Sequence, residues 1–374
     1  MAEKKRYIFV DLLRGLALLV MIEVHVFNAF LDPSIKAQSW FSVLNYINGL
    51  VAPSFLFVSG FAFILSTNSN ERIKLFSPAV TKRLSRIGLI FLVGYSLHLP
   101  RYSFTQMMKI SEAEMITFYN VDVLQCIATG LLLLLLMKVV TSNEKHFNSV
   151  LLGSTIAVIG LAPFAWQYDF TNVFPVWLAN YFNQKNGSLF PLFPWLGFMF
   201  TGAIAAKYFL TLKDDAEQKR FISRLTITGI TLVIITHLVL TELTPLEIRS
   251  IRPNPFFFLQ RLGYVFLLLV LCWHYDQKRK ITKSFILDFS RESLIVYWFH
   301  LTVLFAVIFG GKSLTMIVNH SYNVIEAIIA TIILVILMII AAKIWGGVKS
   351  KYRKASKIIS IVIITSAVIV FFIR

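Results

Sequence analysis

Long uninterrupted runs of apolar residues constrain this chain more than any other feature of its sequence. A membrane-spanning helix needs about 20 mostly apolar residues in succession. With 57% hydrophobic and only 15% charged residues, against roughly a quarter charged in ordinary soluble domains, a soluble globular protein is not expected. The sequence predicts an all-α, polytopic membrane helix bundle with about 11 transmembrane helices. The apolar runs lie near residues 8–30, 45–66, 84–100, 121–141, 149–165, 191–211, 222–241, 256–275, 288–310, 324–346 and 356–373.

The distribution of basic residues predicts how this bundle is oriented. The chain holds 36 Lys and Arg against 19 Asp and Glu, a formal charge of +17. With eleven spans, the connections rich in Lys and Arg all fall on one side, which the positive-inside rule assigns to the cytoplasm together with the amino terminus. The outward connections are longer near 101–120, 166–190 and 242–255 and have a different composition, with Tyr in the first two, Trp in the second and Asn in all three. Their aromatic residues form either an interfacial belt or a stacking surface for a sugar.

Several classes of function are not expected. Two cysteines cannot form a disulfide framework, and the sequence has no phosphate-binding loop, HExxH, paired CxxC or GxSxG motif. A nucleic-acid partner would need a basic face on a soluble module. His237 and His274 lie near the ends of apolar runs without metal-ligand spacing. We therefore expect one membrane domain over residues 1–374, in contact with lipid and without a metal or a nucleic-acid partner.

The first apolar run carries the most informative polar residues. Ionisable groups within a span cost about 3 kcal/mol each on insertion scales, so they are functional candidates by default. At about 100° per residue, Asp11, Arg14 and His25 share one face of a helix. Asp11 and Arg14 form either an ion pair at the helix entry or a receptor for an anionic cofactor. His25 is either a buried, hydrogen-bonded imidazole or a proton acceptor that works near neutral pH.

Other polar residues are expected at the same outer level as His25. Each of them alone is more simply an interfacial residue, but together they suggest an outward polar cavity for an acceptor hydroxyl or amine. His300 lies in the middle of the ninth run, where a structural hydrogen bond and a role in the pathway are equally plausible. The residues of this outer level are Asn28, His98, Arg101, Asp122, Gln125, Gln260 and Arg261.

Five segments in order resemble the transmembrane acyltransferase superfamily, which includes the acyltransferase-three glycan O-acyltransferases and the heparan-α-glucosaminide N-acetyltransferase-like family. The VLQ and FPWLGF pieces look more like the second family. The likeness covers residues 6 to about 301, and residues 324–374 add two further helices. The segments are RYIFVDLLRGLALLVMIEVH from Arg6, APSFLFVSGF from Ala52, VDVLQCIA from Val121, LFPWLGFMFTGA from Leu192 and SRESLIVYWFHL from Ser290.

This resemblance implies that a cytoplasmic acyl-CoA, usually acetyl-CoA, donates its acyl group to an acceptor across the membrane, commonly a sugar. Carried over to this sequence, the first-helix motif makes Asp11 and Arg14 an entrance pair for the donor and His25 the catalytic histidine. In the lysosomal branch the catalytic histidine lies in an outward loop after the first helix. This sequence has no histidine between Phe27 and His98, so we follow the in-helix pattern.

The resulting hypothesis is an acyl-CoA-dependent transmembrane acyltransferase of the bacterial inner membrane. His25 acts as general base or as a transient acyl carrier, and Asn28 or Gln125 polarises the carbonyl oxygen, with Asp122 in the same catalytic group. Arg83 and Arg86 are expected to contact the CoA phosphates, because arginine forks suit phosphate. The residues expected at the acceptor site are His98, Arg101, Gln260, Arg261 and His300.

A second hypothesis comes from another class of protein. A secondary transporter or flippase for an amphiphilic or anionic substrate would use the same intramembrane Asp, Arg and His groups to relay protons or hold charge. Transporters often show related halves, and we find no internal repeat. The spacing from the DLLRG motif to His25 favours the enzyme. For the enzyme, nothing in the sequence selects N-acylation over O-acylation, or an acetyl group over a longer acyl group.

Overall fold

The computed structural model describes residues 6–67, 75–141, 143–243, 245, 247 and 250–373. The chain is 79% helical, and the described part contains no β-strand, only two isolated bridges. The prediction of an all-α fold is confirmed. The helices are α1 Ile8–Phe30, α2 Pro33–Lys36, α3 Ser39–Asn48, α4 Val51–Ser66, α5 Pro78–Leu97, α6 Phe104–Met107, α7 Glu112–Phe118, α8 Val123–Val140, α9 Glu144–Gly160, α10 Ala162–Gln167, η1 Phe170–Asn172, α11 Val176–Ala179, α12 Leu192–Leu210, α13 Asp215–Leu238, η2 Val239–Leu243, α15 Pro255–Arg279, α16 Phe285–Arg291, α17 Ser293–Phe305, α18 Leu314–Val318, α19 Val324–Lys351 and α20 Arg353–Ile373.

Every apolar run of the sequence falls on one helix or on two consecutive helices. Run 8–30 is α1, for example, whereas run 288–310 covers parts of α16 and α17. Six helices within the described residues are long and apolar enough to cross a membrane. The number of spans and their orientation remain predictions. The six helices are Ser39–Ser66, Val123–Val140, Asp215–Leu243, Pro255–Arg279, Val324–Lys351 and Lys354–Ile373.

Polar side chains before the first turn determine where several helices begin. The hydroxyl of Ser77 accepts a bond from the backbone N–H of Val80 at the start of α5. Asn323 and Glu326 form a reciprocal capping box at the start of α19. These side chains satisfy backbone N–H groups that have no partner within the helix.

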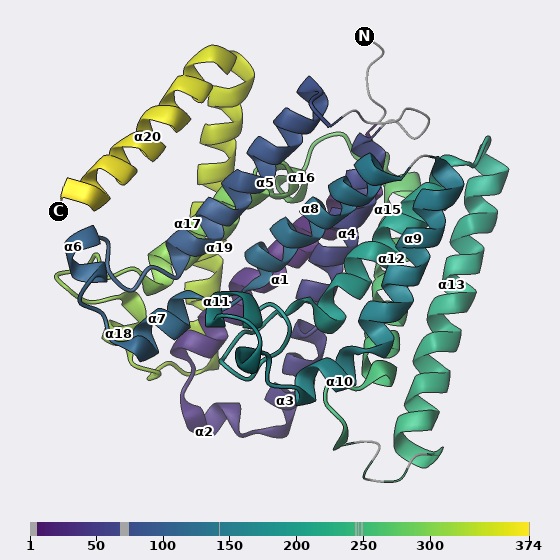
Figure 1. Cartoon of the computed structure of the whole chain (residues 1–374), viewed down its shortest axis with the longest axis horizontal. Helices are drawn as coiled ribbons and strands as arrows, with labels where there is room; N and C mark the ends of the chain where they lie inside the picture. The colour runs from purple at the N-terminus through teal and green to yellow at the C-terminus, as the bar shows by residue number, and fades with distance from the viewer. Residues whose placement is uncertain are drawn as a thin grey trace. The chain divides into compact units, whose positions relative to one another are not determined.

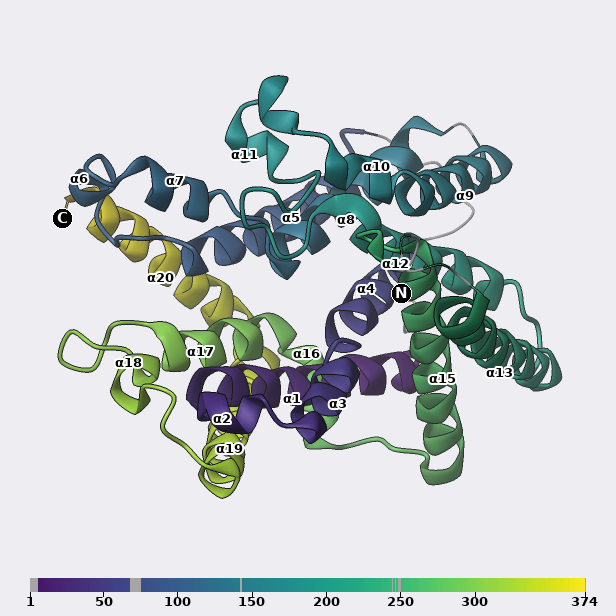
Figure 2. The same ribbon diagram turned by 90° about the horizontal axis from the view of Figure 1, so that it is seen from below.

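The chain divides into two compact units, and each is described by itself. The first unit comprises Met1–Val51, Leu99–Glu114 and Arg279–Arg374. Within it α1 packs against α16, α17 and α19 (Figures 1 and 2). Gly15 allows the contact between α1 and α16, because a Cβ atom at this position would lie 2.2 Å from the carbonyl oxygen of Ile286. A glycine of the DLLRG motif therefore sets how closely these helices approach.

The second unit comprises Ala52–His98 and Met115–Lys278. In it α8 packs against α5, α9 and α12, and α9 also packs against α12. Helices α4 and α12 meet through two glycines. A Cβ atom on Gly60 would lie 1.8 Å from the carbonyl oxygen of Met199, and one on Gly202 would lie 2.0 Å from that of Phe57. Small residues of this kind allow helix backbones to approach closely in membrane proteins.

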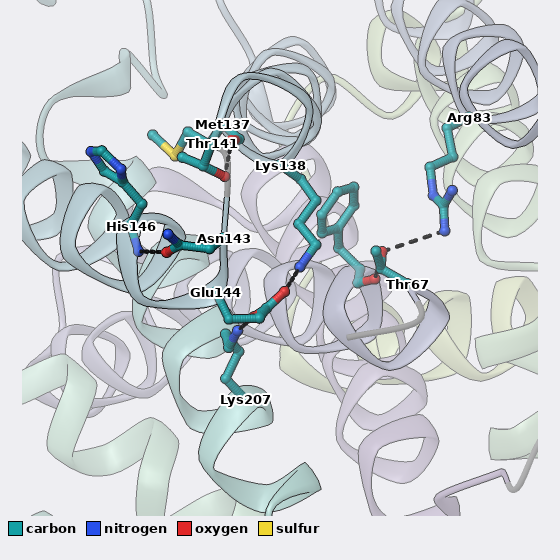
Figure 3. A network of polar contacts seen from close by, with 10 residues as sticks. Thr67, Arg83, Met137, Lys138, Thr141, Asn143, Glu144, His146 and Lys207 are labelled. Atoms are coloured by element: carbon teal, nitrogen blue, oxygen red, sulfur yellow. Dashed lines mark hydrogen bonds and ion pairs between the residues drawn. The ribbon is translucent and has the colours of Figure 1, made fainter. Parts of the chain in front are cut away.

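An ionic cluster joins the ends of α8, α9 and α12 in the second unit. Figure 3 shows Lys138 and Lys207 pointing at the carboxylate of Glu144, with which both form ion pairs. The two ammonium groups also lie 4.9 Å and 5.1 Å from the ring centroid of Phe147. One carboxylate thus ties three helices together, and the aromatic face gives further cation–π attraction.

Candidate active site

A charged cluster surrounds Asp11 in the first turn of α1. Its Oδ2 atom lies 2.5 Å from Arg6 Nε, and Arg14 Nη1 lies 3.8 Å from its Oδ1 atom. Ser290 at the end of α16 donates a hydrogen bond of 2.9 Å to the same Oδ1 atom. Two guanidinium groups therefore approach one carboxylate at this end of α1.

His25 lies farther along α1 and faces His300 of α17. The ring centroids are 5.4 Å apart and the ring planes are inclined by 43°. His25 is half-buried, and the edge of Phe305 approaches its ring at 6.2 Å. His300 is completely buried. The structure thus brings together two of the histidines selected from the sequence.

The hydrogen bonding of His300 defines its tautomer. Nδ1 lies 2.7 Å from the carbonyl oxygen of Val296, one turn earlier in α17. A carbonyl oxygen can only accept, so Nδ1 carries the proton and donates it. Nε2 is then an acceptor, and it is buried with no hydrogen-bond partner in the described structure. An unpaired buried acceptor costs about 1–3 kcal/mol, so this lone pair needs an explanation.

Asn28 and Arg101 lie elsewhere in the first unit. The carbonyl oxygen of Asn28 accepts a 2.6 Å bond from Lys36 Nζ, and desolvation lowers the pKa of this lysine. Arg101 forms an exposed ion pair with Glu114 at 3.0 Å. Hydrogen bonds from Ser111 and then the charge of Arg101 lower the pKa of Glu114. The contacts described for Asn28 and Arg101 therefore lie within the first unit and involve neither His25 nor His300.

In the second unit the structure pairs His98 with Asp122. His98 Nε2 lies 3.5 Å from Asp122 Oδ2, and Asp122 Oδ1 accepts a 2.7 Å bond from the backbone N–H of Val123. Asp122 is therefore also the N-cap of α8. Gln260 on α15 is buried, and Arg261 beside it is half-buried.

Gln125 is the most unusual polar residue of the second unit. Its side chain is completely buried, and among the described residues neither its amide oxygen nor its amide nitrogen has a hydrogen-bond partner. It packs against Gly94 of α5, where an added Cβ would lie 3.1 Å from its Cδ atom. Buried amides are almost always hydrogen-bonded, so a free one suggests a group that pairs with a ligand.

The two arginines expected to contact CoA phosphates differ in their surroundings. Arg83 donates a 3.0 Å bond from Nη2 to the carbonyl oxygen of Ser66 and approaches Thr67 Oγ1 at 3.4 Å, as Figure 3 shows for the latter. It therefore caps the end of α4. Arg86, one turn later, is exposed and is the freer of the two to meet a ligand.

Sequence reasoning assigned no role to four residues that the structure singles out. Ser290 binds Asp11, and its presence in the SRESL segment was the signal that could have revealed it. Glu23 accepts a bond from Asn48, yet Glu23 Oε1 and Asn48 Oδ1 are buried without partners, as is Trp195 Nε1. Nothing in the sequence places Asn48 opposite Glu23, whereas Trp195 lies within the FPWLGF piece.

No group of three or more His, Cys, Asp or Glu residues that could hold a metal ion occurs in residues 6–67, 75–141, 143–243 or 250–373.

Comparison with known proteins identifies the family of the chain. The family model "Heparan-alpha-glucosaminide N-acetyltransferase, catalytic" matches residues 6–244, which is more than half of the chain. A search of curated proteins gives no match. The matched residues include the DLLRG motif and His25, while Ser290 and His300 lie beyond their end. Together with the six apolar helices, the match indicates an integral membrane protein. The chain belongs to the heparan-alpha-glucosaminide N-acetyltransferase catalytic family, a family of membrane acetyltransferases.

Proposed function

We propose that this protein transfers an acyl group, acetyl in the first instance, from cytoplasmic acetyl-CoA to a sugar amine or hydroxyl on the other side of the membrane. The amino terminus lies in the cytoplasm and the protein resides in the bacterial inner membrane. The family supports acetyl transfer. The observation that carries the proposal is that α1 joins the charged cluster of Asp11 to the imidazole of His25 within the matched residues.

The cluster around Asp11 supports binding of the donor. CoA carries several phosphate charges, and arginine binds phosphate through paired N–H groups. Arg6 and Arg14 both approach the carboxylate of Asp11, which places two guanidinium groups together where a phosphate could bind. Exposed Arg86 would contribute a further phosphate contact, with Arg83 beside it on α5.

His25 supports the transfer step. In the direct route it accepts the proton of the acceptor O–H or N–H while the acceptor attacks the thioester carbonyl. The carbon–sulfur bond then breaks, and the proton passes to the CoA thiolate. In the two-step route His25 itself attacks, CoA leaves as the thiol, and the acceptor displaces the acyl group from the imidazole. Both routes give the same products.

The unpaired side-chain amide of Gln125 supports a role in polarising the thioester carbonyl of the donor. Its NH₂ group is buried without a partner, and a donor that meets oxyanion charge in a dry site is among the strongest contributors to catalysis. Asn28 is the alternative donor. Asp122 assists through His98, and Arg101, Gln260 and Arg261 belong to the acceptor side.

Transfer of radiolabelled acetyl groups tests the proposal. Purified protein in proteoliposomes is given labelled acetyl-CoA and an amino sugar or its N-acetylated form. His25→Ala should reduce transfer at least about 100-fold, as expected when a general base is lost. The controls His237→Ala and His274→Ala remove exposed histidines and should retain activity. Full activity in His25→Ala would remove the central claim.

Two further measurements define the reaction. Acetyl-CoA should raise the melting temperature of the protein, because a ligand that binds only the folded state stabilises it. Indifference to acetyl-CoA and CoA, with no transfer to any acceptor, would favour a transporter. Hydroxylamine cleaves acetyl esters and leaves acetamides intact, so treatment of the labelled product distinguishes O-acylation from N-acylation.

A further inference from the structure

We propose that His300 is a positioning residue for His25. Its Nε2 lone pair accepts the N–H of the His25 imidazole, and the other ring nitrogen of His25 then acts as the base. The inference rests on the proposed function, because it concerns the group that performs the transfer. It assigns one role to a residue for which the sequence left two open.

The tautomer of His300 leaves Nε2 as a hydrogen-bond acceptor. The bond from Nδ1 to the carbonyl oxygen of Val296 at 2.7 Å fixes the proton on Nδ1, since a carbonyl oxygen cannot donate. Nε2 is then a neutral acceptor with its direction set by helix α17. Histidines are commonly oriented in this way by a backbone carbonyl at one nitrogen, so that the other nitrogen is ready for its task.

The burial of His300 keeps water away from Nε2. Its side chain has no exposed surface, so water cannot satisfy Nε2, and no described group bonds to it. Tyr297 packs edge-on against the ring at 5.7 Å and contributes an aromatic wall. A buried acceptor without a partner is retained at a cost in stability, so a donor beside Nε2 would be favoured to bond to it.

The distance between the His25 and His300 rings is suited to a hydrogen bond between them. An N–H···N bond places its two nitrogens about 3 Å apart, so imidazoles joined by one have centroids about 5 Å apart. The observed separation of 5.4 Å is close to that value. Rotation of the His25 ring, whose plane is inclined by 43° to that of His300, would bring an N–H onto Nε2.

The chemical role resembles that of the carboxylate that orients a catalytic histidine in hydrolases. When the acceptor loses its proton to His25, the imidazolium formed donates its other N–H to His300 Nε2. His300 remains neutral, and the proton passes from His25 to the CoA thiolate as the carbon–sulfur bond breaks. His300 therefore stabilises the charge that develops on His25 without taking part in bond exchange.

Kinetics of two variants test this role. His300→Leu removes the acceptor and should lower kcat about 100-fold, with the KM values for acetyl-CoA and acceptor changed less than about threefold. His300→Gln keeps a polar amide near the position of Nε2 and should recover at least tenfold of that loss. Trp298→Phe, an exposed position on the same helix, is the control and should leave kcat unchanged.

Three outcomes would overturn the proposal. A folded His300→Leu variant with full kcat shows that Nε2 has no role. Equal losses in His300→Leu and His300→Gln, together with a lowered melting temperature in both, indicate a structural residue. A rise in KM without a fall in kcat indicates contact with substrate instead of with His25.

A measurement without turnover separates this proposal from the proposed function. In protein labelled with ¹⁵N-histidine, the His25 signals are assigned by their loss in His25→Asn. His300→Leu should shift His25 from one dominant neutral tautomer to a mixture. Unchanged His25 signals would refute the positioning role even if the enzyme is active. A tautomer shift in a protein that transfers no acetyl group would refute the proposed function alone.

Discussion

Asp11 accepts a hydrogen bond of 2.9 Å from Ser290, which lies 279 positions later in the chain. The bond joins the DLLRG motif to the SRESL segment, and the packing of α1 against α16 and α17 places His300 beside His25. The family match ends at residue 244, before Ser290 and His300. Helices beyond the matched residues therefore complete both polar clusters of α1.

The bond from Ser290 should matter for binding of the donor. In Ser290→Ala, Asp11 loses a charge-assisted bond and can turn toward Arg14, where its carboxylate would compete with the CoA phosphates for the guanidinium. We expect the KM for acetyl-CoA to rise about tenfold, equivalent to about 1.4 kcal/mol, with kcat nearly unchanged. Ser293→Ala on the adjoining helix is the control. Equal KM values in the two variants would contradict this role.

The planar geometry of the Arg14 guanidinium should contribute to donor binding in addition to its positive charge. Arg14→Lys keeps the charge but loses the paired N–H geometry that suits phosphate, so the KM for acetyl-CoA should rise about fivefold. Arg14→Gln should raise it further, and added salt should weaken donor binding more in wild type than in Arg14→Gln. Steady-state kinetics at two salt concentrations checks both. Exposed Arg279→Gln, which should not alter KM, controls for loss of one charge.

Local structure could be predicted from the sequence, whereas contacts between helices could not. The run at 8–30 coincides with α1, and helical periodicity correctly places Arg14 one turn from Asp11. The partners Ser290 and His300 escaped prediction, because periodicity says which residues share a face but not which helix covers that face. Their contacts depend on tertiary packing of α1 against α16 and α17.

The ninth apolar run shows how a tertiary interaction divides a predicted helix. The sequence predicts one span over 288–310, but the structure has α16 and α17 with Glu292 between them in a non-helical conformation. Glu292 is buried, and both carboxylate oxygens accept bonds from Lys349 of α19, at 3.1 Å and 2.9 Å. Pairing of a buried carboxylate decides the break, and hydrophobicity along the chain carries no sign of it.

Gln125 offers a test that separates function from stability. Gln125→Leu replaces a buried, unpaired amide with an apolar side chain of similar size, which should stabilise the fold by about 1–3 kcal/mol. If the amide polarises the thioester carbonyl, the same change should lower kcat about 100-fold. Thermal unfolding and acetyl transfer are measured on one preparation. A variant that is both more stable and fully active would show that the amide has no catalytic role.

The glycine contact between α4 and α12 should tolerate no side chain. Gly60→Ala places a methyl group 1.8 Å from the carbonyl oxygen of Met199, so the helices must move apart, and we expect destabilisation of about 2 kcal/mol or more. Gly153→Ala in α9 meets no atom within 4 Å and should stabilise its helix by about 0.5–1 kcal/mol. Opposite shifts in melting temperature are therefore expected for the same substitution. Equal shifts would contradict the close approach.

The ionic cluster of Figure 3 should contribute to the stability of the fold, because the carboxylate of Glu144 forms ion pairs with both Lys138 and Lys207. Lys138 is 6% exposed and Lys207 is 16% exposed, whereas Glu144 is 38% exposed. In Glu144→Gln the two ammonium groups lose their shared partner and repel each other. Breaking a fully buried pair costs about 3–5 kcal/mol, and the exposure of Glu144 lowers this expectation to about 1–3 kcal/mol.

A second substitution should repair part of this loss. Glu144→Gln combined with Lys207→Met removes one of the two charges while retaining an apolar side chain against Phe147, so the melting temperature should recover by at least half. Glu112→Gln, at an exposed position of α7, is the control for loss of a carboxylate and should unfold as wild type does. If the double variant is less stable than Glu144→Gln alone, repulsion between Lys138 and Lys207 is not what destabilises the single variant. Each lysine then contributes through its own contacts with α9 and Phe147.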